Sequence, residues 1–317
     1  MTKRILVCGS LAFDFIAVFE GRFKDHILPE HVPNLSVSFF VPALRKEFGG
    51  CAGNISYNLA CLGAQAVPVG AVGHDADEYL ERMRALGIDT GMIKVIEDQF
   101  SAQCFITTDL DSNQIASFHP GAMQFSSRND LTGQEAAWAI VAPDAKEAML
   151  AHAERLHQAH IPFVFDLGQA MPLFTGDDLQ AMIAKADILT ANDYEATVIE
   201  ERTGMSLDEI ATQMKAVIVT YGAQGAVLYQ HGKQQRIAPV AAKEVLDPTG
   251  CGDAHRAGLL YGLTAGWSLY EAACLGNIMG SIKIASQGPQ NHQPNREQIN
   301  RLLREVYELD VAVPTNA

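Results

Sequence analysis

Residues 247–253, with the sequence Asp-Pro-Thr-Gly-Cys-Gly-Asp, combine acids with a flexible backbone and precede the apolar run 259–263. Small residues let successive backbone N–H groups point into one space, and a helix that begins here adds partial positive charge. Such a nest binds an anion, yet the carboxylate of Asp253 beside it would repel one. The combination is useful when Asp253 takes the proton of a hydroxyl that attacks a phosphoryl group held in the nest.

The same pattern also fits a plain helix start, with glycine before the helix and an acid in its first turn. Short glycine motifs are weak evidence on their own. A second glycine-rich element, residues 49–54 (Gly-Gly-Cys-Ala-Gly-Asn), lies far upstream. Its double glycine allows close approach of the backbone to a ligand, and Asn54 offers a donor and an acceptor to a hydroxyl.

These two elements resemble the D-T-x-G-x-G-D signature and the G-G-x-x-x-N element of the ribokinase-like (PfkB) family of carbohydrate and nucleoside kinases. They also occur in the order of that family. Residues 192–195 (Asn-Asp-Tyr-Glu) and 220–222 (Thr-Tyr-Gly) fit the same family. The resemblance therefore covers nearly the whole chain.

The resemblance implies a role for each of these residues in phosphoryl transfer. Asp253 is expected to be the general base. The γ-phosphate of ATP is expected to lie over an anion hole formed by Gly250, Cys251 and Gly252. The substrate-binding residues that the resemblance implies are Ser10, Asp14, Ser38, Gly49, Gly50, Asn54, Cys104, Phe118, Met123 and Gln169. The ATP-binding residues that it implies are Asn192, Thr220, Gly222, Gly225 and Thr249.

Two cation sites are implied as well. Asn192 and Glu195 resemble the N-x-x-E element of the family, which organises Mg²⁺ and the phosphates partly through water, and Mg²⁺ usually keeps several waters. Without the resemblance, this pair is typical of a helix N-cap with an acid in the first turn. Asp247 and the Thr249 carbonyl resemble a monovalent-cation site, which implies K⁺, although its other ligands near 286–290 form no sharp motif.

The expected substrate is a nucleoside. Blocks that resemble the bacterial adenosine-kinase branch of the family are 21–23, 28–31, 116–123 and 192–195. Phe118 is then expected to stack on the base. Cys104 and Phe105 lie where side chains of the lid are expected to contact the base. The resemblance implies ATP-dependent phosphorylation of the 5′-hydroxyl of a purine nucleoside, with adenosine first and inosine or guanosine also accepted. A ribokinase-type sugar kinase and a non-catalytic ligand-binding homologue stay open as alternatives.

Two further features of the sequence bear on function. A dinucleotide-dependent oxidoreductase would need G-x-G-x-x-G directly after the first strand, and residues 9–12 (Gly-Ser-Leu-Ala) lack it. His255 stands where the family usually has an aromatic residue. We expect it to pack as a neutral ring, and a pH-sensitive neighbour for Asp253 is the alternative.

An α/β fold must position these residues. Apolar runs predict strands at 4–8, 67–73, 138–141, 163–166, 188–190, 217–220 and 227–229. Helices are predicted within 49–63, with Gly63 near the C-cap, and at 79–86, 144–159 and 179–186. Buried strands that alternate with helices predict a mostly parallel sheet covered on both faces, as in the three-layer ribokinase-like fold. Ligands collect at the carboxyl ends of the strands of such a sheet.

Two segments depart from this alternation. Short runs at 35–39, 104–108 and 114–118 predict a small β-sheet, and the resemblance makes it a lid that shields the substrate from water. Residues 1–13, 45–98 and 124–317 are then the α/β nucleotide-binding domain. Residues 14–44 and 99–123 are the β-lid.

Composition sets the outer bounds of function. The chain of 317 residues is 48% hydrophobic, which is enough for one large core. Its formal charge of −14 disfavours nucleic acid and anionic membranes as partners. The six cysteines have no metal spacing, and the start of the chain is not typical of a signal peptide, so a reducing cytoplasm is expected. The resemblance also implies that a homodimer can form.

Overall fold

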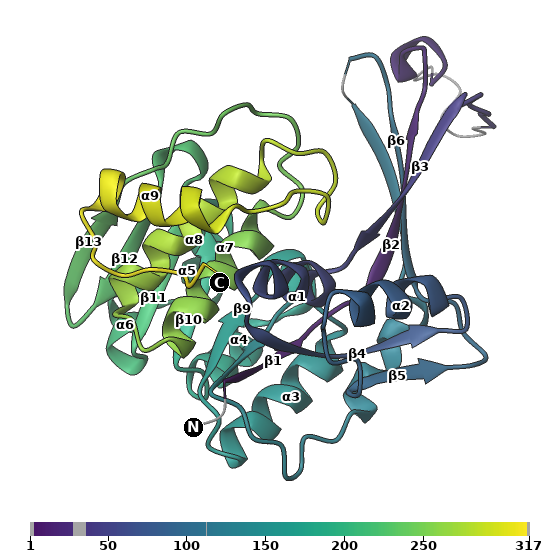
Figure 1. Cartoon of the computed structure of the whole chain (residues 1–317). Coiled ribbons are helices and arrows are strands. Elements are labelled where there is room, and N and C mark those ends of the chain that lie inside the picture. Colours follow the sequence, from purple (N-terminus) through teal and green to yellow (C-terminus); the bar gives the residue numbers. More distant parts are fainter. Residues whose placement is uncertain (1–2, 28–35, 112, 316–317) are drawn as a thin grey trace.

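The computed structural model describes residues 3–27, 36–111 and 113–315. In this part of the chain a large sheet has the strand order β13-β12-β11-β10-β9-β8-β1-β4-β5 (Figure 1). All its neighbouring strands are parallel except β11, β12 and β13, which pair antiparallel. The strands are β1 (Arg4–Cys8), β4 (Gln65–Gly73), β5 (Ile93–Ile96), β8 (Trp138–Val141), β9 (Phe163–Asp166), β10 (Ile188–Asn192), β11 (Ala216–Thr220), β12 (Ala226–Gln230) and β13 (Lys233–Ile237).

Helices cover both faces of this sheet. They are α1 (Cys51–Leu62), α2 (Asp77–Ala85), α3 (Lys146–Gln158), α4 (Gly176–Ile183), α5 (Asp193–Thr203), α6 (Leu207–Gln213), α7 (Cys251–Thr264), α8 (Leu269–Lys283) and α9 (Arg296–Tyr307). Helices α3 to α6 pack on one face, and α1, α7, α8 and α9 on the other. Alternate residues of β1, such as Leu6 and Val7, enter the two separate cores. The predicted α/β class with a mostly parallel sheet is confirmed.

Local signals decide where the helices begin. Helix α4 starts at Gly176, earlier than predicted, because the side chain of Thr175 caps it and Asp178 completes a capping box. Helix α1 ends as predicted at Gly63, which adopts a left-handed φ of 83°. The helices predicted at 79–86 and 144–159 are α2 and α3, with ends that differ by one or two residues.

A separate small sheet has the strand order β3-β2-β6-β7, and we call it the lid. Its strands are β2 (Ala12–Val18), β3 (Ala43–Gly49), β6 (Ala102–Thr108) and β7 (Gln114–His119). Strands β2 and β6 pair parallel, and the other neighbours pair antiparallel. The lid strands rise away from the α/β domain in Figure 1. The small sheet is confirmed, whereas the exact division of the chain between lid and domain stays a prediction.

One predicted lid strand is wrong. Leu35 lies outside the described residues, and residues 36–40 have no strand structure. The two strands beside β6 and β7 are instead β2 and β3. Strand β2 alternates aromatic residues with Asp14, and no strand was predicted at these residues.

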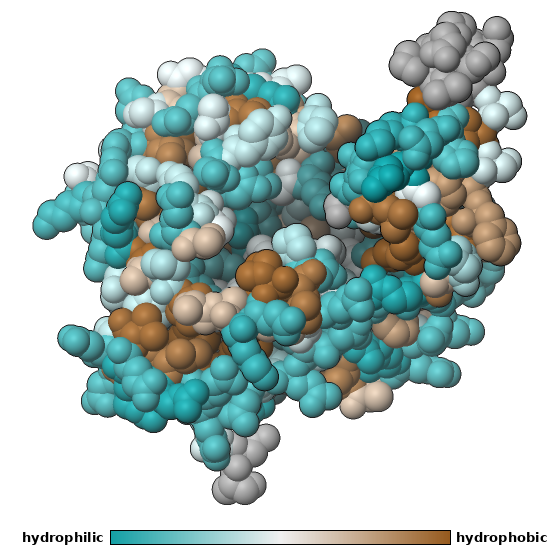
Figure 2. Space-filling view, turned by 90° about the horizontal axis from the view of Figure 1, so that it is seen from above, coloured by the Kyte–Doolittle hydropathy of each residue, from teal (hydrophilic) through white to brown (hydrophobic). Residues whose placement is uncertain are grey.

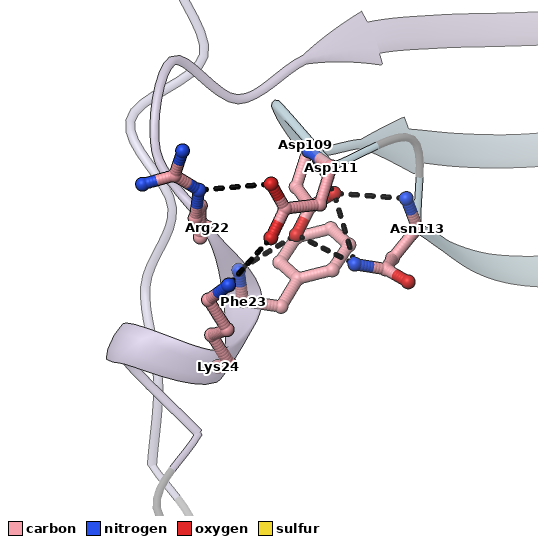
Figure 3. A network of polar contacts seen from close by, with 6 residues as sticks. All are labelled: Arg22, Phe23, Lys24, Asp109, Asp111 and Asn113. Carbon is pink, nitrogen blue, oxygen red and sulfur yellow. Dashed lines mark hydrogen bonds and ion pairs between the residues drawn. The ribbon is translucent and has the colours of Figure 1, made fainter.

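A polar cluster holds the tip of the lid together (Figure 3). The carboxylate of Asp109, only 4% exposed, accepts hydrogen bonds from the backbone N–H groups of Phe23, Asp111 and Asn113. Asp111 pairs with Arg22 and Lys24 at 2.9 and 2.8 Å. The segment after β2 is thereby tied to the turn between β6 and β7.

Within the described ranges, no helix is both long and apolar enough to cross a bilayer.

Candidate active site

The glycine-rich stretch forms the loop that leads into α7, as its composition predicts. Gly250 has a φ of 79°, and a Cβ atom there would lie 2.8 Å from the Cβ of Pro289. Only glycine fits this position without strain. Helix α7 follows at once, and the N–H of Ala254 donates to the carbonyl of Gly250.

The first turn of α7 contains backbone N–H groups that do not donate to a backbone carbonyl of the described residues. No backbone carbonyl of the described residues accepts from the N–H groups of Gly252 and Asp253. The N–H of Cys251, expected in the anion hole, donates instead to the carbonyl of Pro248 at 3.1 Å. Free N–H groups and the positive end of the helix dipole suit an anion, so the turn can hold a phosphoryl group.

The two distant motifs of the sequence meet at Asp253. Asn54 Nδ2 donates to Asp253 Oδ2 at 2.8 Å. Gln290 Nε2 donates to Asn54 Oδ1 at 3.0 Å, which fixes the orientation of the Asn54 amide. The carboxylate of Asp253 is partly buried, and burial raises its pKa to about 6 while the bond from Asn54 lowers it. Asp253 is therefore ionised at neutral pH and still basic enough to accept a proton.

Asp14 faces the same place from β2. A Cβ atom on Gly49 would lie 2.6 Å from Asp14 Oδ2, so the glycine leaves room for the carboxylate. Burial raises the pKa of Asp14 to about 6, and the nearby carboxylates of Glu47, Asp253 and Asp247 raise it as well. Because the charge of Asp253 is among those that raise the pKa of Asp14, the two acids lie in the same part of the molecule.

Ser10 and Gly50 hold this corner of the backbone. Ser10 Oγ accepts from the N–H of Cys51 at 3.1 Å, and the Ser10 carbonyl accepts from Ala52 at 2.9 Å. Gly50 has a φ of 83°, and a Cβ atom there would lie 2.6 Å from the Ser10 carbonyl oxygen. In this structure Ser10 supports the start of α1, where Asn54 lies.

The lid presents a row of side chains on the face that carries Asp14. In the register of the sheet Asp14 pairs with Cys104, and Cys104 pairs with Phe118. Directly paired residues lie on the same face of a sheet, so these three side chains stand in line across β2, β6 and β7. Phe118 is 53% exposed and Cys104 is half-buried. An acid is thus followed along this row by an exposed aromatic ring.

The residues predicted for ATP lie at the carboxyl ends of neighbouring strands. Asn192 pairs with Thr220 at the ends of β10 and β11. Gly222 and Gly225 form the turn from β11 to β12, both with positive φ. Thr249 donates its N–H to Asp247 Oδ1 at 2.9 Å in the loop before α7. Ligands of parallel sheets collect at this edge.

A buried ion pair behind the anion hole was missed by sequence reasoning. Arg256 Nη2 lies 3.0 Å from Asp166 Oδ1, with side chains 5% and 6% exposed. A Cβ atom on Gly252 would lie 3.7 Å from Arg256 Nη1, so the guanidinium stands directly behind the loop. The available signal was an acid at the carboxyl end of the predicted strand 163–166.

Within the described part of the chain, three residues that were predicted to bind the substrate form no hydrogen bond with the acids of the candidate site. Ser38 is exposed in a segment without regular structure, Met123 is half-buried, and Gln169 is exposed. No hydrogen bond between described residues links any of them to the acids of the site. Their roles stay predictions.

His255 packs between α7 and α8. A Cβ atom on Gly276 would lie 2.9 Å from His255 Cδ2, and the ring is 4% exposed. Burial lowers the pKa of His255 to about 3, so the ring stays neutral at physiological pH. This supports the expected packing role over a pH-sensitive one.

The residues present fit Mg²⁺ only through water. Among the described residues no group of three or more His, Cys, Asp or Glu side chains is placed to hold a metal ion. Glu195 accepts from the Asn192 N–H and Nδ2, both at 2.9 Å, and donates its own N–H to Asn192 Oδ1. This is the capping box of the alternative interpretation. An aqueous Mg²⁺ on ATP phosphates needs no more than such outer contacts.

The residues beside Asp247 do not fit K⁺ in the same way. The Asp247 carbonyl accepts from Lys283 Nζ at 2.6 Å, and the Ser286 carbonyl accepts from the same Nζ at 3.1 Å. The two carboxylate oxygens of Asp247 accept from the N–H groups of Thr249 and Gly288. A lysine ammonium thus already uses two main-chain oxygens beside Asp247, and both carboxylate oxygens of Asp247 already accept hydrogen bonds.

The surface is hollowed between the lid and the part of the α/β domain that carries α7 and α8 (Figure 2). Two pockets, of about 320 and 420 Å³, lie elsewhere, and Asp253 lines neither of them.

Comparison with known proteins agrees with this arrangement. The model of the pfkB family of carbohydrate kinases matches residues 2–296. The nucleoside kinase of Methanocaldococcus jannaschii is 27% identical over 299 residues, which cover 94% of this chain and 95% of that protein. The structure of Burkholderia thailandensis nucleoside kinase in complex with inosine has a TM-score of 0.87 at 46% identity, covering 96% of this chain and 98% of the other. The complex of that kinase with ADP-inosine has a TM-score of 0.84 at 47% identity, covering 96% of each chain.

Proposed function

The chain belongs to the pfkB family of carbohydrate kinases, and from this membership we propose that it transfers the γ-phosphoryl group of ATP to the 5′-hydroxyl of a purine nucleoside. Adenosine is the first choice, and inosine and guanosine are accepted as well. The similarity to two nucleoside kinases supports the substrate class. The proposal goes beyond the family because other members act on plain sugars.

The row of Asp14, Cys104 and Phe118 on one lid face carries the proposal. Neighbouring strands lie about 4.8 Å apart, so the backbone of Phe118 is roughly 10 Å from that of Asp14. A ribose bound at Asp14 alone leaves the exposed ring unused. A nucleoside in the same place brings its base to Cys104 and Phe118, where stacking on an aromatic ring is worth about 1–3 kcal/mol per base.

The catalytic step uses few side chains. Asp253 accepts the proton of the 5′-hydroxyl, and Asn54 holds the Asp253 carboxylate through its Nδ2. The free N–H groups of Gly252 and Asp253 hold the transferred phosphoryl group, with the positive charge of Arg256 behind them. Mg²⁺, when bound with ATP, neutralises charge on the phosphates. Asn192 and Glu195 would contact the water molecules around such an ion.

The kinase is expected to accept several purine bases because Cys104, in the middle of the row formed with Asp14 and Phe118, has a small side chain. Cys104 offers a weak S–H donor and little bulk, so it discriminates poorly between purines. The inosine complex of the Burkholderia thailandensis kinase supports acceptance of a 6-oxo purine. A cytoplasmic location, a role in purine salvage and a homodimer also stay predictions.

One assay tests the substrate. ADP release is measured with ATP and Mg²⁺ against adenosine, inosine, guanosine, cytidine, ribose and fructose 6-phosphate. We expect kcat/KM for adenosine and inosine to exceed that for ribose by about tenfold to a hundredfold, which is the stacking contribution expressed as a rate. Phe118→Ala should remove most of that difference without changing turnover of ribose. A higher kcat/KM for ribose or fructose 6-phosphate than for every nucleoside would replace the proposal with a sugar kinase.

A further inference from the structure

The resemblance to the family implies K⁺ beside Asp247, but the carbonyl and carboxylate oxygens of Asp247 already accept hydrogen bonds, one of them from Lys283. We propose that the ammonium group of Lys283 takes the place of this cation, so that the chain carries its own fixed monovalent charge and needs no K⁺. The inference rests on the proposed kinase activity. It concerns how the anion hole is supported and is independent of which nucleoside is phosphorylated.

Lys283 is the last residue of α8, and its side chain is fully buried. Its Nζ donates to the main-chain carbonyls of Asp247 at 2.6 Å and Ser286 at 3.1 Å. Main-chain carbonyls of two loops are typical ligands of a monovalent cation, and an ammonium group has similar charge and takes the same oxygens as acceptors. The ammonium therefore lies where the two loops that flank the start of α7 come together.

The charge of Lys283 has no carboxylate partner. No ion pair within 4 Å joins Lys283 to an acid of the described residues. The nearest acid, Asp247, uses both carboxylate oxygens on backbone N–H groups. Burial lowers the pKa of Lys283, and Asp247 partly offsets this effect. A buried ammonium without an ion pair costs free energy, which an anion bound close by would recover.

The anion expected close by is the phosphoryl group at the start of α7. The Asp247 carbonyl that Lys283 binds also lies 3.9 Å from the Sγ of Cys251, the first residue of α7. The ammonium group therefore lies directly behind the predicted anion hole.

The end of α8 is also attached firmly to the loop. The Ile284 carbonyl accepts from the N–H groups of Leu246 and Asp247 at 2.9 and 3.2 Å. A Cβ atom on Gly280 would lie 3.5 Å from the Cys251 carbonyl oxygen, so α8 runs closely past the first turn of α7. A charge carried on this helix is held in place before any ligand arrives. A bound K⁺ would instead have to be collected from solution.

The first experiment uses the unaltered protein. Initial rates of ADP release, with whichever nucleoside is turned over, are measured in tetramethylammonium chloride with 0–100 mM KCl at constant ionic strength. We expect kcat to change by less than about twofold, because the cation is already present. A stimulation of about threefold or more by K⁺ would overturn the proposal. No turnover in any salt would count against the proposed kinase function, and the RbCl soak described below would still test Lys283.

The second experiment replaces the charge while keeping the length of the side chain. In Lys283→Met we expect kcat to fall by about tenfold to a hundredfold, in line with the loss of one fixed charge near the phosphates, and to recover at least partly with K⁺ or NH₄⁺. Lys233→Met, at an exposed position on β13, is the matched control and should keep full activity without K⁺ dependence. A purely structural lysine would give a loss that no cation restores, which would contradict the proposal.

Direct observation of the site needs no activity. Crystals of both proteins are soaked in RbCl, and anomalous difference density is calculated near Asp247. We expect a peak between the carbonyls of Asp247 and Ser286 in Lys283→Met only. A peak at this place in the unaltered protein would overturn the proposal. If Lys283→Met does not fold, the salt dependence and the RbCl soak of the unaltered protein decide the matter.

Discussion

Asp253 is tuned by its immediate neighbours. Burial raises its pKa to about 6, and the hydrogen bond from Asn54 Nδ2 works in the opposite direction. A carboxylate with this pKa is about nine-tenths ionised at pH 7, yet accepts a proton more readily than an ordinary aspartate. The residue environment thus matches the task of a base that works near neutral pH.

The decrease of kcat/KM at low pH, which is the acid limb of the rate profile, should reflect the raised pKa of Asp253. Catalysis needs ionised Asp253, so kcat/KM should be level above pH 7 and fall as the pH drops through about 6. Asp14, whose pKa is also raised to about 6, titrates in the same range, so the limb should fall by between tenfold and a hundredfold per unit. The profile is measured from pH 4.5 to 8.5 with adenosine.

Asn54→Ala should move this limb to higher pH, because the variant loses the bond that lowers the pKa of Asp253. Its lower overall rate does not affect the position of the limb. A profile of the unaltered protein that stays level down to pH 5 would show that neither acid must be ionised. If kcat/KM of Asn54→Ala fell at the same pH as in the unaltered protein, Asn54 would not influence the pKa of the group that titrates.

At the scale of elements, the anion hole depends on how α7 lies against α8. A Cβ atom on Gly258 would lie 2.8 Å from the Gly276 backbone, so the helices touch through glycine. Gly258→Ala should force them apart and lower the free energy of unfolding by about 1–3 kcal/mol. It should also reduce kcat, since the loop before α7 is bonded to the end of α8.

Chemical denaturation and steady-state kinetics on the same samples test this prediction. Gly280→Ala is the control, because its Cβ atom would make only an ordinary contact of 3.5 Å and alanine favours a helix by about 0.5–1 kcal/mol. Stability of Gly258→Ala equal to that of Gly280→Ala would contradict the close helix contact.

The lid is the second element on which the proposed activity depends. Asp109 accepts from three backbone N–H groups at its tip, so Asp109→Ala leaves those donors without a partner. We expect KM for the nucleoside to rise severalfold while the melting temperature of the α/β domain changes little, because the tip is remote from both large cores. Kinetics and calorimetry measure the two effects. An unchanged KM would mean that the tip does not help to hold the substrate.

The elements themselves were largely predictable. Apolar runs such as 163–166 and 217–220 lack alternation because both faces of β9 and β11 are covered. Strand β2 was missed because Asp14 interrupts its apolar residues. The alternation of apolar and polar side chains between the two faces of the small sheet would have indicated the strand. Strand β13 was missed because four of its five residues are exposed and polar.

At the scale of the whole molecule, the site joins residues that the sequence keeps far apart. Motif spacing predicted that Asn54 and Asp253 belong to one site, and the structure places them in contact. The pairs of Arg256 with Asp166 and of Lys283 with Asp247 were not predicted. Such contacts depend on how α7 and α8 pack against each other on one face of the sheet, and single residues inside helices carry no local sign of it.

The whole account depends on Asp253 taking a proton from a hydroxyl held beneath the lid. The most direct measurement is kcat of Asp253→Asn with ATP, Mg²⁺ and adenosine or inosine, together with the Kd of the nucleoside from calorimetry. We predict a Kd within about threefold of the unaltered protein and a kcat lower by about a hundredfold to ten-thousandfold, the usual contribution of a positioned base. A kcat within about threefold of the unaltered protein would contradict the account.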